Sequence, residues 1–429
     1  QNLLVRSQAL YPVELQAHNS QLSNKLLKLK DINLYTDYMS NSVVITSAVR
    51  TAIGSLGRSL KNVSGDELGS TVISEAIKTS NIQKDEVDEI IMGQVLTGGT
   101  GQNPARQAAI KSGVPKETPA YIVNQVCGSG IRSVASGFQS IKSGDSKIVI
   151  AGGQESMSLA PHAAYLRDGK KLGDVEMTDT MIKDGLWDAF NGYHMGITAE
   201  NVASKFQVTR DQQDRFALNS QNKAIKAQKE NYFKKEIVNF KIRSKKAEIN
   251  FNIDEHPRDG INIEALQRLK PVFQKDGTVT AGNASGINDG AAAVTLMTEN
   301  TANKKGIQKL AKIKSWASCG VDPALMGTGP IPSSKKALDL AGWSVKDLDL
   351  LEVNEAFAAQ SIAVLKTLGI PEEKVNVNGG AIAIGHPIGA SGTRILVTLI
   401  HEMIRRNVNK GLATLCIGGG MGIAMCVER

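Results

Sequence analysis

The stretch VNQVCGSG, residues 123–130, leads an extended apolar segment into a turn of small residues. Apolar side chains recur every three or four positions over residues 131–141, so a helix is expected to follow this turn. Residues 377–383 repeat the order of strand, small-residue turn and helix, and residues 416–420 (CIGGG) parallel residues 149–153 (VIAGG). The sequence therefore predicts two related α/β halves with a site between them.

Strands and helices alternate along the chain from residue 42 onward, which is typical of a layered α/β domain with a mainly parallel sheet. Strands are expected over residues 43–46, 89–96, 121–124, 147–151, 310–317, 348–353, 412–416 and 421–427, and helices over residues 66–82, 357–368 and 395–404. Residues 155–285 carry more charge, with one clear helix signal, the capping box from Thr209 to Gln212. We expect this stretch to be an inserted loop domain.

These patterns divide the chain into four parts. The N-terminal half covers residues 39–157 and is completed by part of residues 286–308, the loop domain covers residues 158–285, and the C-terminal half covers residues 309–429. Residues 1–38 lack glycine and any catalytic-looking cluster, so we expect a disordered or non-native extension. On this hypothesis the functional protein begins at Met39, and loss of activity on deleting residues 1–38 would contradict it.

Composition narrows the class of protein. Of 429 residues, 41% are hydrophobic and 21% are charged, as in ordinary globular proteins. The net charge of +8 permits an anionic partner, but the basic residues are scattered in pairs and aromatics make up only 4%, which argues against nucleic-acid binding. The four cysteines lack metal-site spacing, and no apolar run approaches about 20 residues. We expect no metal, no membrane span and a reducing, cytoplasmic location.

Two of the four cysteines lie in settings that suit catalysis. Cys127 sits where a strand meets a helix, and N–H groups at a helix N-terminus lower the pKa of a thiol and can bind an oxyanion. Cys416 lies at a strand end before three glycines, where a thiol can act as an acid or base beside a bound ligand. Each could instead be a small buried core residue, which is the role we assign to Cys319 and Cys426.

His386 and Asn354 are the polar candidates. His386 lies between a glycine-rich loop and a proline, so it is either a base or oxyanion donor on a stiff loop, or a turn histidine bonded to backbone. Asn354 follows an apolar strand and either holds a water or polarises a carbonyl, or simply caps the next helix. No phosphate-binding loop or dinucleotide fingerprint competes with this set.

Together, and in this order, these residues resemble the thiolase family, and within it the short-chain acetyl-CoA acetyltransferases. The matching segments are CGSG (127–130), NEAF (354–357), GHP (385–387), CIGGG (416–420), GQNPAR (101–106), GYHMG (192–196) and NASGIND (283–289). The likeness runs from about Ser42 to the C-terminus. It implies the thiolase fold, with two related halves in α-β-α-β-α layers and an inserted loop domain.

The resemblance implies a role for each candidate. Cys127 would be the nucleophile that takes an acetyl group from acetyl-CoA, and His386 the base that activates it. Cys416 would be the second acid/base, which removes an α-proton from a second acetyl-CoA. Asn354 would hold a water that completes one oxyanion hole with His386, and the N–H groups of Cys127 and Gly418 would form the other.

The resemblance also implies contacts with coenzyme A, which is substrate and product, so no separate cofactor is expected. The expected contacts are Leu186, His194 and Ser285 along the pantetheine, Arg258 near the nucleotide end, and Met195, Met326 and Phe357 around the acyl pocket. Bulky side chains in that pocket favour a two-carbon unit, so acetyl-CoA and acetoacetyl-CoA are the expected partners. A basic loop with Arg167, Lys170 and Lys171 is expected to attract the anionic substrate.

A broad-range 3-ketoacyl-CoA thiolase of fatty-acid β-oxidation remains the alternative, because it shares every catalytic residue and differs only in pocket size. A ketoacyl synthase ranks lower, because such enzymes use one cysteine with two histidines. A non-enzymatic binding protein would not need all four of the candidate catalytic side chains. We expect a homo-oligomer, a tetramer built as a dimer of dimers, that acts in the cytoplasm.

Overall fold

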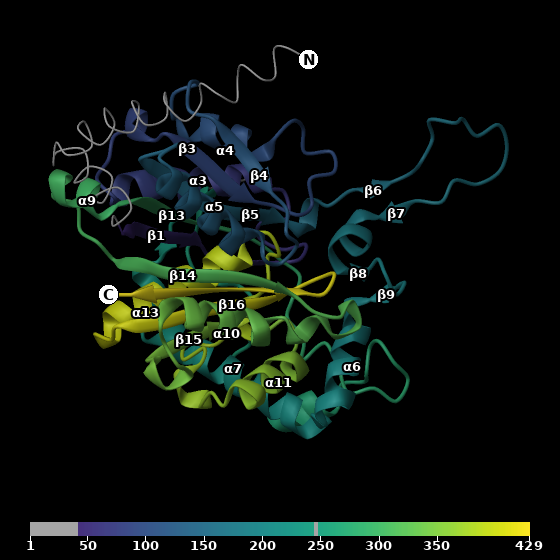
Figure 1. Cartoon of the computed structure of the whole chain (residues 1–429). Coiled ribbons are helices and arrows are strands. Elements are labelled where there is room, and N and C mark those ends of the chain that lie inside the picture. The colour runs from purple at the N-terminus through teal and green to yellow at the C-terminus, as the bar shows by residue number, and fades with distance from the viewer. Residues whose placement is uncertain (1–41, 244–247) are drawn as a thin grey trace, which may run out of the picture. The chain divides into compact units, whose positions relative to one another are not determined.

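An 11-stranded sheet organises the unit Val43–Arg429 (Figure 1). The computed structural model describes residues 42–243 and 248–429. The predictions for residues 1–38 and for a start at Met39 lie outside the described residues. Nine strands follow the order β15-β16-β17-β14-β1-β13-β5-β3-β4, while β10 pairs with β1 and β2 pairs with β13.

The strands of this sheet are β1 (Val43–Thr51), β2 (Gly54–Ser55), β3 (Glu89–Gly93), β4 (Ala120–Val123), β5 (Ile148–Ser156), β10 (Ile237–Val238), β13 (Asn288–Thr298), β14 (Ala311–Gly320), β15 (Leu350–Val353), β16 (Lys410–Ile417) and β17 (Met421–Glu428). Three short hairpins pair β6 (His162–Ala163) with β7 (Thr178–Asp179), β8 (Trp187–Asp188) with β9 (Tyr193–His194), and β11 (Phe240–Arg243) with β12 (Glu248–Phe251).

The α-helices are α3 (Gly65–Thr79), α4 (Pro104–Ser112), α5 (Ser129–Ser143), α6 (Met195–Phe206), α7 (Arg210–Lys229), α8 (Ile263–Gln267), α9 (Glu299–Lys305), α10 (Pro330–Ala341), α11 (Ala358–Leu368), α12 (Ala381–Ile384) and α13 (Ser391–Arg406). Shorter helical turns are η1 (Lys84–Glu86), η2 (Met157–Leu159), η3 (Met181–Leu186), η4 (Tyr232–Lys235), η5 (Pro323–Thr328), η6 (Val345–Asp347) and η7 (Glu372–Lys374).

The strand order repeats between the two ends of the sheet. The N-terminal half runs β4-β3-β5-β13-β1, and the C-terminal half runs β15-β16-β17-β14, with Val375 bridging to Leu351 on the outer side of β15. The halves meet where β1 pairs with β14 at Val44 and Ile45. This repeat confirms the prediction of two related α/β halves.

The prediction of a mainly parallel sheet is wrong. Strand β13 is antiparallel to β1 and to β5, and β17 is antiparallel to β14 and to β16. The β16–β17 pair is joined by a tight glycine turn, a connection that only antiparallel neighbours allow. The sheet is therefore mixed.

Helices cover both faces of each half, as the five-layer prediction requires. Apolar residues of α5 and α13 share one core with strands of both halves, so these two helices form the central layer. Helices α3 and α4 pack on the outer face of the N-terminal half, and α10 and α11 on that of the C-terminal half (Figure 1). Every residue of β1 is buried, because both faces of the strand are covered.

Glycines let the two central helices cross at their N-terminal ends. A Cβ on Gly130 of α5 would lie 2.5 Å from the backbone nitrogen of Thr393, and one on Gly392 of α13 would lie 2.4 Å from that of Ile131. Neither position has room for a larger residue. The crossing brings the starts of both helices, and the loops that precede them, to the same place.

Of two local predictions, one is confirmed and one is wrong. The expected capping box is present, since Thr209 and Gln212 exchange hydrogen bonds at the start of α7. Strand β5, however, does not end before Gly152 and Gly153 but runs through them to Ser156. These glycines allow backbone contact with neighbouring segments, because their Cβ positions lie 2.2 Å from the carbonyl oxygens of Ala292 and Gly389.

Candidate active site

Cys127 sits in a strained turn between β4 and α5. The preceding residue, Val126, has φ 45°, a left-handed conformation that a β-branched residue adopts only when its surroundings impose it. Three hydrogen bonds impose it here: the Val126 N–H donates to Asn124 (3.0 Å), the Ser129 hydroxyl donates to the Val126 carbonyl (2.6 Å), and the Gln125 N–H donates to Ser129 Oγ (2.9 Å). The turn holds the half-buried thiol at the start of α5.

The C-terminal half reaches this thiol through the turn after β16. A Cβ on Gly128 would lie 2.4 Å from Cδ1 of Ile417, so only glycine lets the two halves come this close. The backbone N–H groups of Gly418 and of Cys127 itself hydrogen-bond to the sulfur. The structure therefore brings together the two N–H groups that were expected to form one oxyanion hole.

Burial decides the protonation state of Cys127. It raises the pKa of the thiol to about 11, and the negative charge of Glu155 adds to this, while the two N–H groups lower it by less. The expectation that the helix N-terminus leaves Cys127 with a lowered pKa is therefore wrong for the free protein, because desolvation of the thiolate outweighs the N–H contacts. At neutral pH the nucleophile candidate is a thiol that needs a base.

Cys416 lies in an apolar cluster with the residues expected around the acyl pocket. This buried thiol, in β16, packs with Met195, Met326 and Phe357. Burial and the neighbouring charge of Cys127 raise the pKa of Cys416. Gly418 adjoins the same cluster, since its Cβ position lies 3.4 Å from Cε of Met195. The two thiols thus come from different halves of the fold and lie close enough for the charge of Cys127 to act on Cys416.

His386 is buried and held by both halves. Its backbone N–H donates to Oδ1 of Asn288 (2.9 Å), and its Nδ1 lies 2.5 Å from the hydroxyl of Ser391. Because that hydroxyl donates its one proton to the carbonyl of Pro387 (2.8 Å), its oxygen accepts from Nδ1–H. Nε2 is then the unprotonated nitrogen, which can act as a base. Burial, and then the positive charge of Arg394, lower the pKa of His386 to about 3, so the ring is neutral.

Asn354 does not cap a helix. The N-cap of α11 is Phe357, three residues further on, so the simple capping explanation of Asn354 is wrong. Its Nδ2 lies 3.5 Å from both ring nitrogens of His386, and its buried Oδ1 has no hydrogen-bond partner among the described residues. The amide is therefore in place beside His386, with an oxygen still available to a water or substrate.

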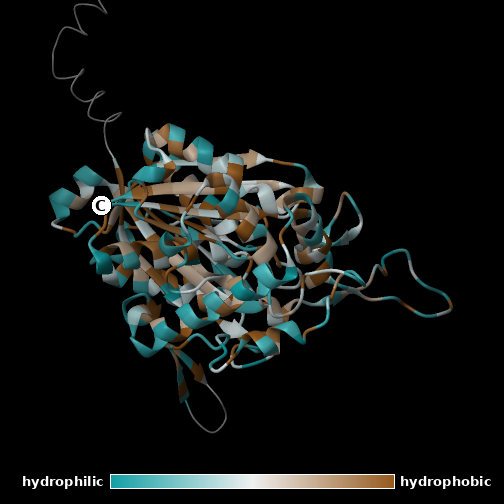
Figure 2. Ribbon diagram, turned by 90° about the horizontal axis from the view of Figure 1, so that it is seen from below, coloured by the Kyte–Doolittle hydropathy of each residue, from teal (hydrophilic) through white to brown (hydrophobic). Residues whose placement is uncertain are grey.

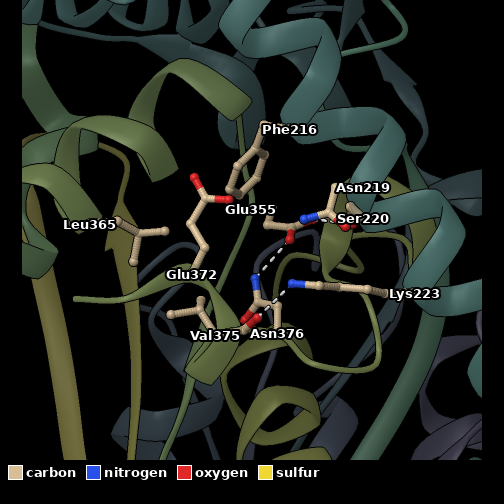
Figure 3. Close-up of a pocket in the computed structure, with 9 residues that line it drawn as sticks. All are labelled: Phe216, Asn219, Ser220, Lys223, Glu355, Leu365, Glu372, Val375 and Asn376. Carbon is tan, nitrogen blue, oxygen red and sulfur yellow. Dashed lines mark hydrogen bonds between the residues drawn. The ribbon is translucent and has the colours of Figure 1, made fainter. Parts of the chain in front are cut away.

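Glu355 directly follows Asn354, and its side chain lies beside Ser220 and Asn376 (Figure 3). Its buried carboxylate accepts hydrogen bonds from Ser220 of α7 (2.6 Å) and from Asn376 (2.8 Å). Burial raises the pKa of Glu355. The adjacent cavity measures about 10 Å³, the room of a single water molecule, so it is no substrate site. The second residue of the NEAF segment thus has a structural role.

The residues expected to bind coenzyme A are only partly brought together. The His194 ring stacks on Phe273 with centroids 4.6 Å apart, and Phe273 meets Phe357 edge-on at 6.4 Å. The Ser285 N–H donates to the carbonyl of Ala356 (2.9 Å), beside the NEAF segment. Leu186, at the end of η3, is half-buried and Arg258 is exposed; neither belongs to the cluster around Cys416 in the described part of the chain.

Sequence reasoning missed several residues of this site. Ser391 sets the orientation of His386 and is the first residue of α13, five positions after the histidine. Phe273 lies in an irregular segment. Asn288 opens β13 within the NASGIND segment, but no local pattern indicates its hydrogen bond to the backbone of His386. Glu155 had a signal, since a carboxylate at the buried end of an apolar strand is rarely accidental.

The fold and the paired thiols define a thiolase. The thiolase N-terminal domain family matches residues 43–300, and the thiolase C-terminal domain family matches residues 307–429. The chain therefore belongs to the thiolase family.

Individual relatives are similar over nearly their whole length. The chain is 62% identical to the acetyl-CoA acetyltransferase of Rhizobium meliloti (strain 1021) over 392 residues, which cover 91% of this chain and all of the relative. It is 54% identical to the cytosolic acetyl-CoA acetyltransferase of Rattus norvegicus, with 91% and 99% covered.

Solved structures agree with these relatives. The Bacillus anthracis acetyl-CoA acetyltransferase superposes with a TM-score of 0.89 at 46% identity, covering 90% of this chain and 98% of the other. Human mitochondrial 3-ketoacyl-CoA thiolase in complex with CoA gives a TM-score of 0.87 at 41% identity, covering 91% and 98%.

Proposed function

We propose that this protein is an acetyl-CoA C-acetyltransferase, which reversibly joins two acetyl-CoA molecules into acetoacetyl-CoA and CoA. The observation that carries the proposal is the meeting of two thiols from different halves, with Gly418 N–H on the sulfur of Cys127 and Cys416 in the adjoining apolar cluster. The names of the relatives support it.

The first half-reaction uses Cys127 and His386. Nε2 of neutral His386 takes the thiol proton as the sulfur attacks the thioester carbonyl of acetyl-CoA, and returns that proton to the departing CoA sulfur. The negative charge that develops on the carbonyl oxygen needs fixed donors, a role we assign to His386 and a water held by Asn354. The product is acetyl-Cys127.

The second half-reaction uses Cys416. Nε2 of His386, neutral again after the first half-reaction, takes the proton of the Cys416 thiol. The Cys416 thiolate then removes an α-proton from a second acetyl-CoA, and the resulting carbanion attacks the carbonyl of acetyl-Cys127. The N–H groups of Cys127 and Gly418 stabilise the oxyanion, because both already point at the sulfur. Collapse of this intermediate breaks the bond to sulfur and releases acetoacetyl-CoA, and the Cys127 sulfur takes a proton back from His386. The covalent intermediate predicts ping-pong kinetics.

Residues 158–285 are proposed to bind coenzyme A, which is a substrate and product, so no further cofactor is required. The stacked pair of His194 and Phe273 leads toward Phe357 and suits an apolar pantetheine arm. Arg258 is proposed to meet the anionic nucleotide end, which fits its exposed position. Leu186 and Ser285 are proposed to lie along the pantetheine.

The acyl-chain length of the preferred substrate distinguishes the proposed function from its alternative, a broad-range 3-ketoacyl-CoA thiolase. Met195, Met326 and Phe357 crowd the space beside Cys416, which favours a two-carbon acyl unit. The test is steady-state thiolysis, with CoA, of acetoacetyl-CoA beside a long-chain 3-ketoacyl-CoA. We expect a strong preference for the four-carbon substrate. Equal or better use of the long-chain substrate would support the alternative, a broad-range thiolase of fatty-acid degradation.

We propose further that the protein is a homo-oligomer, a dimer of dimers. Strand β4 ends the sheet with an unpaired edge among the described residues, and such edges readily pair with a second copy. The arm between β6 and β7 projects from the rest of the described unit and exposes Tyr165 and Leu172 by 98% and 92% (Figures 1 and 2). Apolar side chains in such positions are typical of a protein interface.

A cytoplasmic location is proposed from the four free cysteines and the cytosolic rat relative. In residues 42–243 and 248–429, no helix has the length and apolar character to cross a bilayer. No group of His, Cys, Asp or Glu side chains suited to a metal ion occurs in the same stretches.

A further inference from the structure

Glu155 is a buried carboxylate that the mechanism above does not use. Glu155 lies near the end of β5 and is fully buried. Among the described residues, its carboxylate accepts hydrogen bonds from backbone N–H groups and not from a cationic side chain. A carboxylate without a counter-ion is costly to bury. The hydrogen bonds that hold this buried carboxylate in place therefore call for a functional explanation.

Three backbone N–H groups converge on this carboxylate. Oε2 accepts from Val95 (3.0 Å) and from Gly389 (2.9 Å), and Oε1 accepts from Leu96 (3.2 Å). Gly389 belongs to the loop that carries His386, while Val95 and Leu96 belong to the loop after β3. One side chain thus ties the His386 loop to two segments of the N-terminal half.

The same loops form the wall beside Cys127. Val95, Leu96 and Ile388 pack together, and Cys127 packs against their cluster. Gly389 comes so close that a Cβ there would lie 2.7 Å from Oε2 of Glu155. The carboxylate therefore sits directly behind the residues that contact the nucleophile candidate.

We propose that Glu155 is a positioning residue of this site: it fixes the His386 loop relative to Cys127 through Gly389, and it places a carboxylate behind the wall against which Cys127 packs. The inference rests on the proposed function for the roles of Cys127 and His386. Its geometric basis, the three N–H contacts and the shared wall, is independent of substrate.

The carboxylate also acts on Cys127 through its charge, and this effect has a defined pH range. Burial, with a smaller contribution from the charge of Asp289, raises the pKa of Glu155 to about 7, and the charge of ionised Glu155 raises the pKa of Cys127. Other titratable groups around this pair are Cys416 of β16, Asp289 of β13, whose pKa burial raises to about 6, and neutral His386. Ionisation of Glu155 near pH 7 should therefore suppress thiolate formation.

The test is the rate of Cys127 alkylation by iodoacetamide in the full chain from pH 5 to 10, with the modified residue identified by mass spectrometry. In the wild-type protein the logarithm of the rate should rise with pH, flatten near pH 7, and rise again. The vertical offset between the two rising parts of the profile measures the effect of the Glu155 charge on the Cys127 thiol. Glu155→Gln should remove the flattening and react faster at pH 8, whereas Asp289→Asn should keep the flattening.

The positioning part is tested by thiolysis of acetoacetyl-CoA. Glu155→Asp keeps the charge but cannot reach all three N–H groups, so it should lower kcat about tenfold or more with little change in KM, and keep the flattening. Glu402→Gln, which removes another buried carboxylate, should change neither readout.

An unbroken alkylation line in the wild-type protein, or full kcat in Glu155→Asp, would overturn the proposal. The wild-type alkylation profile needs no variant to fold. Absence of thiolysis in the wild-type protein would instead refute the proposed function, while the alkylation profile would still test Glu155.

Discussion

At the scale of single residues, the site is a set of groups held in their neutral forms by burial. Cys127 and Cys416 both have raised pKa values, and that of His386 is lowered to about 3. The resting site therefore holds two thiols and a neutral imidazole, not a thiolate–imidazolium pair. On the proposed mechanism, chemistry begins when the substrate supplies a carbonyl for attack.

Substituting the two cysteines one at a time should separate the two half-reactions. Cys127→Ser is expected to abolish formation of the acetyl-enzyme, because it removes the nucleophile. Cys416→Ser should still release CoA and take up one acetyl group on Cys127, but should lose condensation. Labelled acetyl-CoA with intact-protein mass spectrometry measures the first step, and acetoacetyl-CoA formation measures the second. Full condensation by Cys416→Ser would show that its assigned role is wrong.

The lowered pKa of His386 makes stability depend on pH. Between about pH 6.5 and 3 the unfolded chain binds a proton that the folded protein does not, so stability is present above the unfolded pKa and is lost as pH falls. His386→Asn should reduce this slope by up to about 1.4 kcal/mol per pH unit. Urea unfolding between pH 6.5 and 4.5 measures it.

The control for this measurement is His162→Asn, which changes an exposed histidine of the arm. An unchanged slope in His386→Asn would mean that His386 is not held neutral by the fold.

At the scale of elements, glycines decide how closely the two halves approach. Gly128 at the start of α5 faces Ile417 at the end of β16, and Gly130 and Gly392 let α5 and α13 cross. Each glycine removes a Cβ that would separate the segments carrying Cys127, His386 and Gly418. The geometry of the site thus depends on backbone contacts between elements far apart in sequence.

Gly128→Ala tests this dependence. The added Cβ would lie 2.4 Å from Cδ1 of Ile417, so we expect a loss of about 1–3 kcal/mol in unfolding free energy. Thiolysis activity should fall as well, because the turn carrying Cys127 must shift. Adding Ile417→Ala to Gly128→Ala should recover part of the stability relative to the sum of the single changes. Strict additivity in this double-mutant cycle would contradict the steric explanation.

At the scale of the whole molecule, two features of the described unit remain without a partner. These are the edge of β4 and the exposed apolar side chains of the arm between β6 and β7. The arm also carries Arg167, Lys170 and Lys171, the basic residues expected to attract substrate. Oligomer contact and substrate attraction are separable roles of the arm.

Replacing residues 164–177 by a short Gly-Ser linker should lower the mass of the assembly, measured by sedimentation equilibrium, from a tetramer to a dimer. Changing only Arg167, Lys170 and Lys171 to Gln should keep the tetramer. That triple variant should instead raise KM for acetoacetyl-CoA at low salt and lose this effect at high salt. An unchanged mass after the arm is removed would exclude it as the contact between dimers.

The sequence was sufficient where a local pattern carries the information. The turn around Cys127, the paired glycine segments and the thiolase motifs predicted the two related halves and the family, because strand-to-helix turns and motif order depend on neighbouring residues. The same local reasoning failed for sheet direction, and it left open whether Asn354 caps a helix, which it does not. Both depend on which distant segment lies alongside.

Only the tertiary structure decided the electrostatics of the site and its supports. Burial reversed the expected pKa shift of Cys127, since desolvation depends on every atom packed around a group. Ser391, Asn288 and Glu155 act on His386 or its loop across 5, 98 and 234 positions of chain. By itself the sequence predicted which groups to expect in the site; the fold decided how each is charged and oriented, because both follow from contacts that no local pattern records.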